Sequence, residues 1–231
     1  MAEVLITLGI IGVVAAMTMP SLIANHRKNV VEARLAKFYS VMNQAVQRAE
    51  ADYGDKTGWD TFELLYETDD EGNKDTSKPV PNIEYFNKYF APYLVTTKVE
   101  TVDKSGYVKV YFPDGSIATF TAASIKFWPN GKDFSTMESQ TKPGTLRDDP
   151  KYNGIKYFTF YFNPTKNTDS NKYHYSKGVE PYKYDWDGTE EMLLTKSDIG
   201  CKETVSNERA YCTALIQING WKIPKNYPLK F

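Results

Sequence analysis

The residues best suited to chemistry in this sequence are the carboxylates of an acidic loop late in the chain. Asp185, Asp187 and Glu190 alternate with Trp186 and with a turn glycine, Gly188. Hard cations such as Ca²⁺ bind several oxygen ligands supplied by a flexible loop. The pattern matches the opening of a calcium-binding loop and predicts a metal site at the three carboxylates. The alternative is a solvated turn.

Other chemistry has less support. Residues 69–71 with Asp75 form a second, weaker acidic candidate. The two histidines, His26 and His174, are far apart in the sequence, and the sequence contains no His-x-x-Glu-His, Gly-x-Ser-x-Gly or Cys-x-x-Cys pattern. We therefore expect a protein that is not an enzyme, with no catalytic residue and no cofactor other than the calcium ion considered above.

Composition limits the classes of partner. The chain of 231 residues has a formal net charge of −1, so it has no general basic field, and no nucleic-acid partner is expected. Aromatic residues make up 14%, with 17 tyrosines, which favours strands and argues against disorder. The length suits one domain, or a small domain with an appendage.

The two cysteines, Cys201 and Cys212, are close together near the C-terminus. In an oxidising compartment such a pair predicts a disulfide bond, and a loop of this size stabilises the fold by about 3 kcal/mol in the chain-entropy model. The alternative is a pair of free buried thiols in a reducing compartment. The compartment depends on the element at the start of the chain.

That element is the apolar run over residues 2–24, which contains a single acid, Glu3. About 20 apolar residues in a helix cross the hydrocarbon layer of a membrane. A carboxylate at that depth costs about 2.5–3.5 kcal/mol on insertion scales, so Glu3 is a functional candidate. The basic residues at 26–28 follow the run, and charge bias alone would place the C-terminal side in the cytoplasm.

A second pattern continues directly from the first. Apolar residues recur at spacings of three and four, at Val31, Leu35, Phe38, Met42, Ala45 and Ala49. Charged residues are assigned to the other faces, among them Arg27, Lys28, Glu32, Arg34, Lys37 and Arg48. These spacings predict one long helix, apolar over residues 1–24 and amphipathic over 25–53, kinked at Pro20 and ended by Gly54.

The remaining elements are expected to be short. Residues 54–81, 129–154 and 163–188 are polar or turn-rich and predict loops, whereas residues 82–90 predict a short helix. Strands are expected at 94–102, 107–112, 117–121 and 155–162. Ser206 is expected to cap a last helix that carries Tyr211, Leu215 and Ile218 and stops before Gly220. The class is α+β, a long N-terminal helix packed against an antiparallel sheet, with residues 25–231 forming the globular domain.

The N-terminal run AEVLITLGIIGVVAAMTMP resembles the methylation segment of type IV pilins and of type II secretion pseudopilins. The match covers the acid Glu3, the small residues Gly9 and Gly12, and Pro20, all in the family's spacing. The family carries Gly and then Phe-Thr-Leu before the alanine equivalent to Ala2, whereas this sequence has Met1 at the leucine position. Leader cleavage and N-methylation are therefore not assigned to any residue present.

The resemblance implies a pilin-like fold and a role in assembly. The helix would first cross the bacterial inner membrane once, with the globular domain in the periplasm, and would later pack with other pilin or pseudopilin subunits in a filament built at a membrane platform. Glu3 would then pair with the N-terminal amine of a neighbouring subunit, because a buried charge is tolerated when it is paired. Gly9 and Gly12 would allow close approach of helices. The alternative for Glu3 is a position in the lipid headgroups.

The leading functional hypothesis is a structural subunit of a type II secretion pseudopilus or a type IV pilus. The alternative is a singly anchored periplasmic binding protein that captures sugar or DNA on the Tyr- and Trp-rich face at residues 152–186. An anchored enzyme is a third class, disfavoured because the sequence lacks catalytic motifs.

Overall fold

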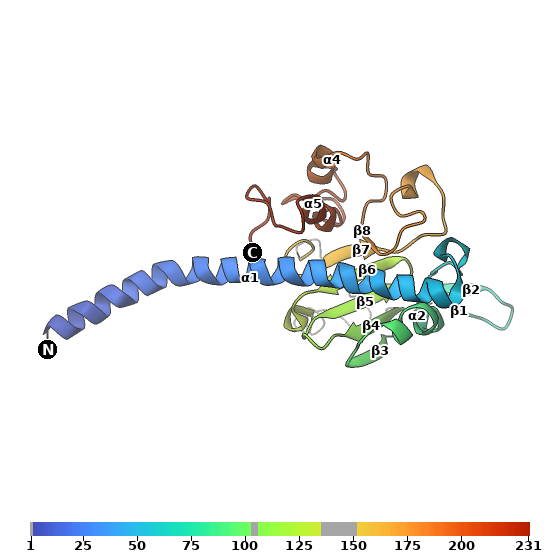
Figure 1. Ribbon diagram of the computed structural model, residues 1–231, viewed down its shortest axis with the longest axis horizontal. Coiled ribbons are helices and arrows are strands. Elements are labelled where there is room, and N and C mark those ends of the chain that lie inside the picture. Colours follow the sequence, from blue (N-terminus) through green and yellow to red (C-terminus); the bar gives the residue numbers. More distant parts are fainter. Residues whose placement is uncertain (1, 103–105, 135–151) are drawn as a thin grey trace.

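The computed structural model describes residues 2–102, 106–134 and 152–231, with side chains from residue 7 onward. The fold is α+β, with a long N-terminal helix lying across an antiparallel sheet. Helix α1 (Ala2–Tyr53) is continuous and projects far beyond the globular domain at its N-terminal end (Figure 1). Gly54 ends it in a left-handed conformation, with φ of 79°.

The second half of α1 forms one wall of the core, as the spacing predicts. All six residues of the apolar stripe are buried: Val31, Leu35, Phe38, Met42, Ala45 and Ala49. Pro20 lies inside the continuous helix, and the N-terminal half of α1 curves gradually with no sharp kink (Figure 1). Proline lacks a backbone donor and its ring crowds the carbonyl of residue i−4, which bends a helix.

The main sheet has six strands in sequential order, each antiparallel to its neighbour. Its strands are β3 (Lys98–Val102), β4 (Tyr107–Tyr111), β5 (Ile117–Thr121), β6 (Ser124–Trp128), β7 (Phe158–Tyr161) and β8 (Glu180–Pro181). Phe38 of α1 stacks on Phe127 of β6 at 4.1 Å between ring centroids and meets Phe160 of β7 edge-on at 5.0 Å. Aromatic pairs of this kind bury large areas and fix the helix on the sheet.

Helix α2 (Ile83–Tyr89) closes the end of the sheet near the C-terminus of α1, and its position agrees with the sequence expectation. The Asn82 side chain caps it by accepting a hydrogen bond from the Tyr85 amide. Its Phe86 ring packs on Phe120 of β5 at 5.0 Å. Short 3₁₀ turns η1 (Lys56–Gly58) and η2 (Ala91–Tyr93) flank this region.

Two strand regions of the structure are missing from the sequence prediction. Residues 54–81 are not simply a loop, since β1 (Leu65–Thr68) and β2 (Lys74–Val80) pair as a separate hairpin. Their side chains are mostly exposed, so no apolar alternation indicates them. Strand β6 is also absent from the expectations, because its turn from β5 uses Ala122, at φ of 48°, where glycine or asparagine would give a turn signal.

The C-terminal expectations also need correction. Strand β7 covers only four residues of the predicted 155–162. Helix α5 (Cys212–Ile218) begins after Tyr211 and is not capped by Ser206, whose amide instead donates to the Ser197 carbonyl at 3.1 Å. Helix α4 (Glu190–Thr195), capped by Thr189, is not predicted, and neither is the 3₁₀ turn η4 (Asp169–Asn171).

Candidate membrane and assembly surface

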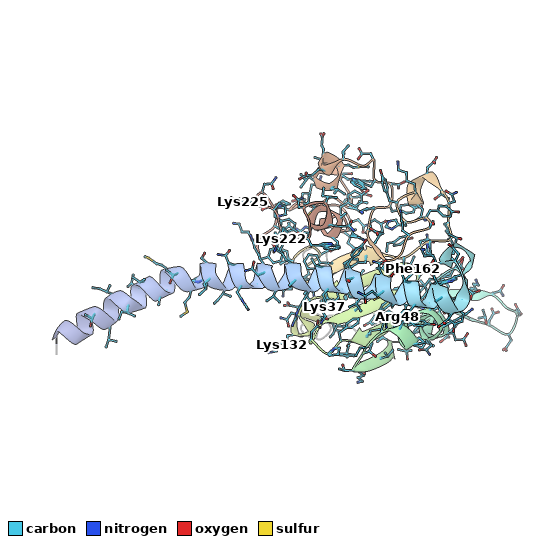
Figure 2. The ribbon with its side chains drawn as sticks, in the orientation of Figure 1. Lys37, Arg48, Lys132, Phe162, Lys222 and Lys225 are labelled. Atoms are coloured by element: carbon cyan, nitrogen blue, oxygen red, sulfur yellow. A yellow bond between two sulfur atoms is a disulfide. The ribbon has the colours of Figure 1, made fainter. Side chains whose placement is uncertain are left out.

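The first half of α1 exposes a continuous apolar surface. Its large side chains are between 54% and 76% exposed: Leu8, Ile10, Ile11, Val13, Val14, Met17, Met19, Leu22 and Ile23. Contiguous exposed apolar area of this extent indicates contact with a membrane or with another protein. In Figure 2 this half of α1 lies beyond the globular domain, with side chains visible along both edges of the ribbon.

This helix is the one candidate membrane span in the described chain. Thr7–Tyr53 contains an 18-residue window apolar enough to cross a bilayer, and none of that window is buried. The core helix of a soluble protein would satisfy the same length and composition, but its apolar residues would be covered. In this molecule they are not.

The predicted assembly residues all lie on this exposed half. Glu3 is in the first turn of α1, and its side chain is outside the described residues. A Cβ added at Gly9 or Gly12 would meet nothing within 4 Å, so neither glycine is required by a contact inside the subunit. Pro20 is also exposed. The surface that carries these residues is therefore free to meet something outside the chain.

The predicted calcium residues have local structural roles. Asp185 is at φ of 56°, and its amide donates to the Ser170 carbonyl at 2.8 Å. Asp187 Oδ1 accepts hydrogen bonds from the Thr189 amide and hydroxyl at 2.8 and 2.7 Å, and these bonds lower its pKa. Glu190 lies in the first turn of α4.

These three carboxylates do not converge. Among the described residues, no group of three or more His, Cys, Asp or Glu side chains could hold a metal ion, and this includes the acidic turn at residues 69–71. Asp69 Oδ1 instead accepts amide hydrogen bonds from Glu71 and Asn73 and shapes the β1–β2 turn. The acidic loops therefore act as turns and helix caps.

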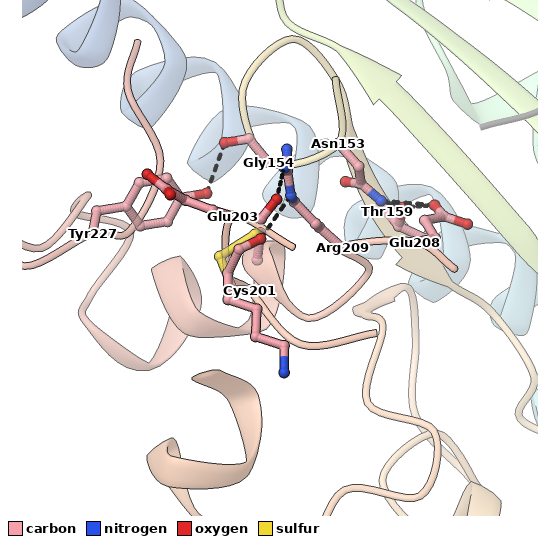
Figure 3. The surroundings of a disulfide bond; sticks show 10 residues. Asn153, Gly154, Thr159, Cys201, Glu203, Glu208, Arg209 and Tyr227 are labelled. Atoms are coloured by element: carbon pink, nitrogen blue, oxygen red, sulfur yellow. Dashed lines mark hydrogen bonds between the residues drawn. A yellow bond between two sulfur atoms is a disulfide. The ribbon is translucent and has the colours of Figure 1, made fainter. Parts of the chain in front are cut away.

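The predicted pairing of Cys201 with Cys212 is present as a disulfide bond (Figure 3). It joins the segment after α4 to the first residue of α5. The enclosed loop folds back on Arg209, whose guanidinium donates to the carbonyls of Lys202 and Glu203. Gly154 passes so close that a Cβ there would lie 2.5 Å from Cys212 Sγ.

A polar cluster next to the disulfide ties this lobe to the sheet. Asn153 Nδ2 donates to Glu208 Oε1 at 2.7 Å and to Thr159 Oγ1 at 2.9 Å, and Thr159 Oγ1 lies 2.9 Å from the same carboxylate (Figure 3). Tyr227 donates to the Gly154 carbonyl at 2.7 Å. No local sequence pattern predicts this cluster, because some of its members are far apart in the chain. Thr159 and Glu208, for example, are separated by 49 positions.

The structure corrects the predicted position of Glu32. The helical spacing predicts it on one of the charged faces of α1, but it is buried, with 8% exposure. Its carboxylate accepts hydrogen bonds from Lys222 Nζ at 2.8 Å and from the Ile223 amide at 2.9 Å. The C-terminal segment of the chain covers this face of the helix, which the helical periodicity alone does not reveal.

Two of the hollows on the described surface are bordered by charged or aromatic side chains. One, of about 380 Å³, runs beside α1 and is bordered by Arg34, Lys37 and Arg48. Lys37 pairs with Asp114 at 2.9 Å, and Arg34 donates to the carbonyls of Asp114 and Pro129. Burial alone would raise the pKa of Asp114, but hydrogen bonds from Ser116 and Lys37 lower it to about 2. These contacts hold the β4–β5 turn against α1.

The second hollow, of about 300 Å³, lies on the Tyr-rich face. Tyr161, Tyr182 and Tyr184 line it together with Asn163, Lys166, Thr168 and Asn171. His174 packs behind Tyr161, with 4.9 Å between ring centroids. Aromatic rings beside polar groups are typical of small-ligand pockets.

Comparison with known proteins gives one match. Residues 21–231 match a family of unknown function (DUF6613). The chain belongs to this family. No curated protein and no solved structure matches it. The family match of this DUF6613 protein covers the globular domain and the amphipathic half of α1, whereas residues 2–20, which carry the resemblance to pilins, lie outside it.

Proposed function

We propose that this DUF6613 protein is a structural subunit of a type II secretion pseudopilus or a type IV pilus and works by polymerisation without catalysis. The observation that supports the proposal is the division of α1 into two halves. One face of residues 31–49 is buried in the core of the domain, whereas the residues before them expose apolar side chains on every side.

The division has a physical consequence. Burial of apolar surface stabilises by about 25 cal/mol per Å², so an uncovered apolar helix is strongly driven to find a cover. A bilayer covers such a helix before assembly, and the same helices of neighbouring subunits cover it in a filament. A helix that is apolar on all sides suits both environments.

In this proposal Glu3 sets the register between subunits. Among apolar helices, its carboxylate is tolerated when a cation, such as the N-terminal amine of a neighbour, lies beside it. The helices would then pack at one axial offset, because any other offset would leave the charge unpaired.

The test is the Glu3→Ala variant, compared with wild type and with Glu63→Ala, which removes an exposed acid from the globular domain. We expect Glu3→Ala to insert into membranes normally but to lose the ladder of multimers formed by chemical cross-linking in membranes. The Glu63→Ala control should keep the ladder. Wild-type multimers in Glu3→Ala would remove the role assigned to this residue.

The second candidate function is a membrane-anchored binding protein that takes up a sugar or DNA on its Tyr-rich face. The hollow bordered by Tyr161, Tyr182 and Tyr184 favours it. The same cross-linking experiment separates the two functions, because an anchored receptor would remain a monomer in the membrane.

A further inference from the structure

The C-terminal segment returns to α1 at the place where the helix leaves the globular domain. Figure 1 shows the C-terminus beside α1 at this point. Lys28 Nζ lies 6.0 Å from the centroid of the Phe231 ring. One turn further along the helix, the Glu32 carboxylate accepts hydrogen bonds from Lys222 Nζ and from the Ile223 amide. The segment is therefore fixed at the base of the domain.

The side chains of residues 221–231 fall into a set that faces the core and a set that is exposed. Trp221, Ile223, Tyr227 and Phe231 pack against the main core, and Leu229 is buried. The lysines between them, Lys222, Lys225 and Lys230, are exposed. Figure 2 shows Lys222 and Lys225 at the end of the domain that faces the apolar half of α1, with Lys132 at the same end across the helix.

Arg27 and Lys28 of α1, together with Lys222, Lys225 and Lys230, form a basic cluster where the helix leaves the domain, which we call the collar. Two of its members are paired with acids. Arg27 lies 3.4 Å from Asp133, which Lys156 also contacts at 3.6 Å, and Lys222 lies 2.8 Å from Glu32. Lys222 is still 72% exposed and Arg27 38% exposed.

The collar has the right height for lipid headgroups. Residues 2–24 in a helix span about 34 Å, enough to cross the hydrocarbon layer of roughly 30 Å. Lys28 then lies about 6 Å, and Glu32 about 12 Å, beyond the apolar run. The headgroup layer extends roughly 5–8 Å on each side, so Lys28 falls within it. The segment held by Glu32 lies roughly 4–7 Å beyond it, a gap that long lysine side chains reach across.

We propose that this collar, formed by Arg27, Lys28, Lys222, Lys225 and Lys230, docks the base of the globular domain onto anionic phospholipid headgroups. The inference rests on the membrane anchoring in the proposed function, but not on assembly. Basic residues directly beyond a helix of membrane-spanning length favour an anionic lipid surface over a protein partner. A juxtamembrane Lys or Arg strengthens attachment to an anionic surface about fivefold.

The test places a fluorophore on the full-length chain inserted in vesicles that contain a headgroup-labelled acceptor lipid. Both native cysteines are joined in the disulfide, so a cysteine introduced by Asn226→Cys is labelled selectively. Asp70→Cys, in the β1–β2 turn at the opposite end of the domain, is the matched probe position (Figure 1). Vesicles are either wholly phosphatidylcholine or contain about one-third phosphatidylglycerol.

We expect energy transfer from the residue 226 probe to be several-fold greater in the anionic vesicles and to fall toward the phosphatidylcholine value in 0.5 M salt, because exposed charges are screened. The double variant Lys225→Gln/Lys230→Gln should lose most of the increase. The control Lys172→Gln/Lys177→Gln, with the same change in net charge, should keep it, and the residue 70 probe should not respond.

Three results would overturn the proposal. Equal transfer in both kinds of vesicle would show that lipid charge is irrelevant. If energy transfer changed with the protein-to-lipid ratio and not with lipid charge, the collar would instead bind a second copy of the chain. Release of the protein by alkaline carbonate would show that it is not anchored, which removes the proposed function as well. If Glu3→Ala loses its multimers but still shows the charge-dependent energy transfer, the result bears on assembly and supports docking by the collar independently of it.

Discussion

At the scale of single residues, His174 links the fold to pH. It is buried, and its Nε2 accepts a hydrogen bond from the Lys183 amide at 2.9 Å. Burial, with a smaller contribution from the charge of Lys183, lowers the pKa of His174 to about 3. An Nε2 that accepts must be unprotonated, so the native fold requires a neutral imidazole.

This requirement predicts loss of stability in mild acid. Because the folded pKa lies below the unfolded value of about 6.5, the unfolded state takes up the proton first as pH falls. The contribution of His174 is therefore fully present above pH 6.5 and declines below it, by roughly 2 kcal/mol between pH 7.5 and pH 5. Urea unfolding of the full chain at several pH values measures this slope.

The His174→Gln variant cannot titrate and should flatten the slope over that range, even if it is less stable at neutral pH. His26→Gln, which changes an exposed histidine on α1, should leave the slope of the wild type unchanged. A wild-type slope in His174→Gln would mean that another group causes the acid sensitivity.

At the scale of elements, the contact between α1 and the C-terminal segment depends on Glu32. Its buried carboxylate accepts both a charged hydrogen bond from Lys222 and a backbone hydrogen bond from Ile223. We expect Glu32→Ala to cost about 2–3 kcal/mol, because the Ile223 amide loses its partner and a charge-assisted bond is removed.

Hydrogen exchange locates the effect. In Glu32→Ala the amides of residues 222–231 should exchange faster, whereas those of β4 and β5 should change little. Glu32→Gln keeps an acceptor for the Ile223 amide and should show an intermediate effect. A uniform change over the whole domain would indicate global destabilisation and contradict the local role.

At the scale of the whole molecule, the two halves of α1 belong to different environments. The core begins at Val31, and none of the most apolar window before it is buried. A chain comprising residues 25–231 should therefore fold and remain monomeric without detergent, whereas the full chain should need detergent or lipid. Light scattering and near-ultraviolet circular dichroism of both chains measure this, and aggregation of the shorter chain would contradict it.

The glycines show how closely the globular half is packed. A Cβ at Gly178 would lie 1.9 Å from Asn43 Oδ1, in the place where Asn43 Nδ2 donates to the Val179 carbonyl at 2.9 Å. Tyr39 donates to Glu180 at 2.8 Å along the same face of α1. These contacts between segments more than 130 positions apart join the late loop to the helix.

The sequence by itself determined the long N-terminal helix and the disulfide bond. The spacing from Val31 to Ala49 predicts the buried stripe, Gly54 predicts the end of the helix, and the two cysteines predict the disulfide. These signals are local, since helical periodicity, a left-handed terminus and a redox pair each need only nearby residues. The sequence also shows the apolar run, because its composition alone reveals it, whereas its exposure comes from the structure.

The tertiary structure alone decided which charges are covered and which surface meets the surroundings. Glu32 is buried because residues 222–231 lie on it. Strand β6 pairs with β5 on one side and β7 on the other, and its turn from β5 lacks the glycine or asparagine that would have predicted it. The acidic loop at 185–190 forms a turn and a cap, because the Asp187 carboxylate accepts from the Thr189 amide and the Thr189 hydroxyl accepts from the Met192 amide. Each outcome depends on contacts distant in sequence or on side-chain direction, neither of which a linear pattern specifies.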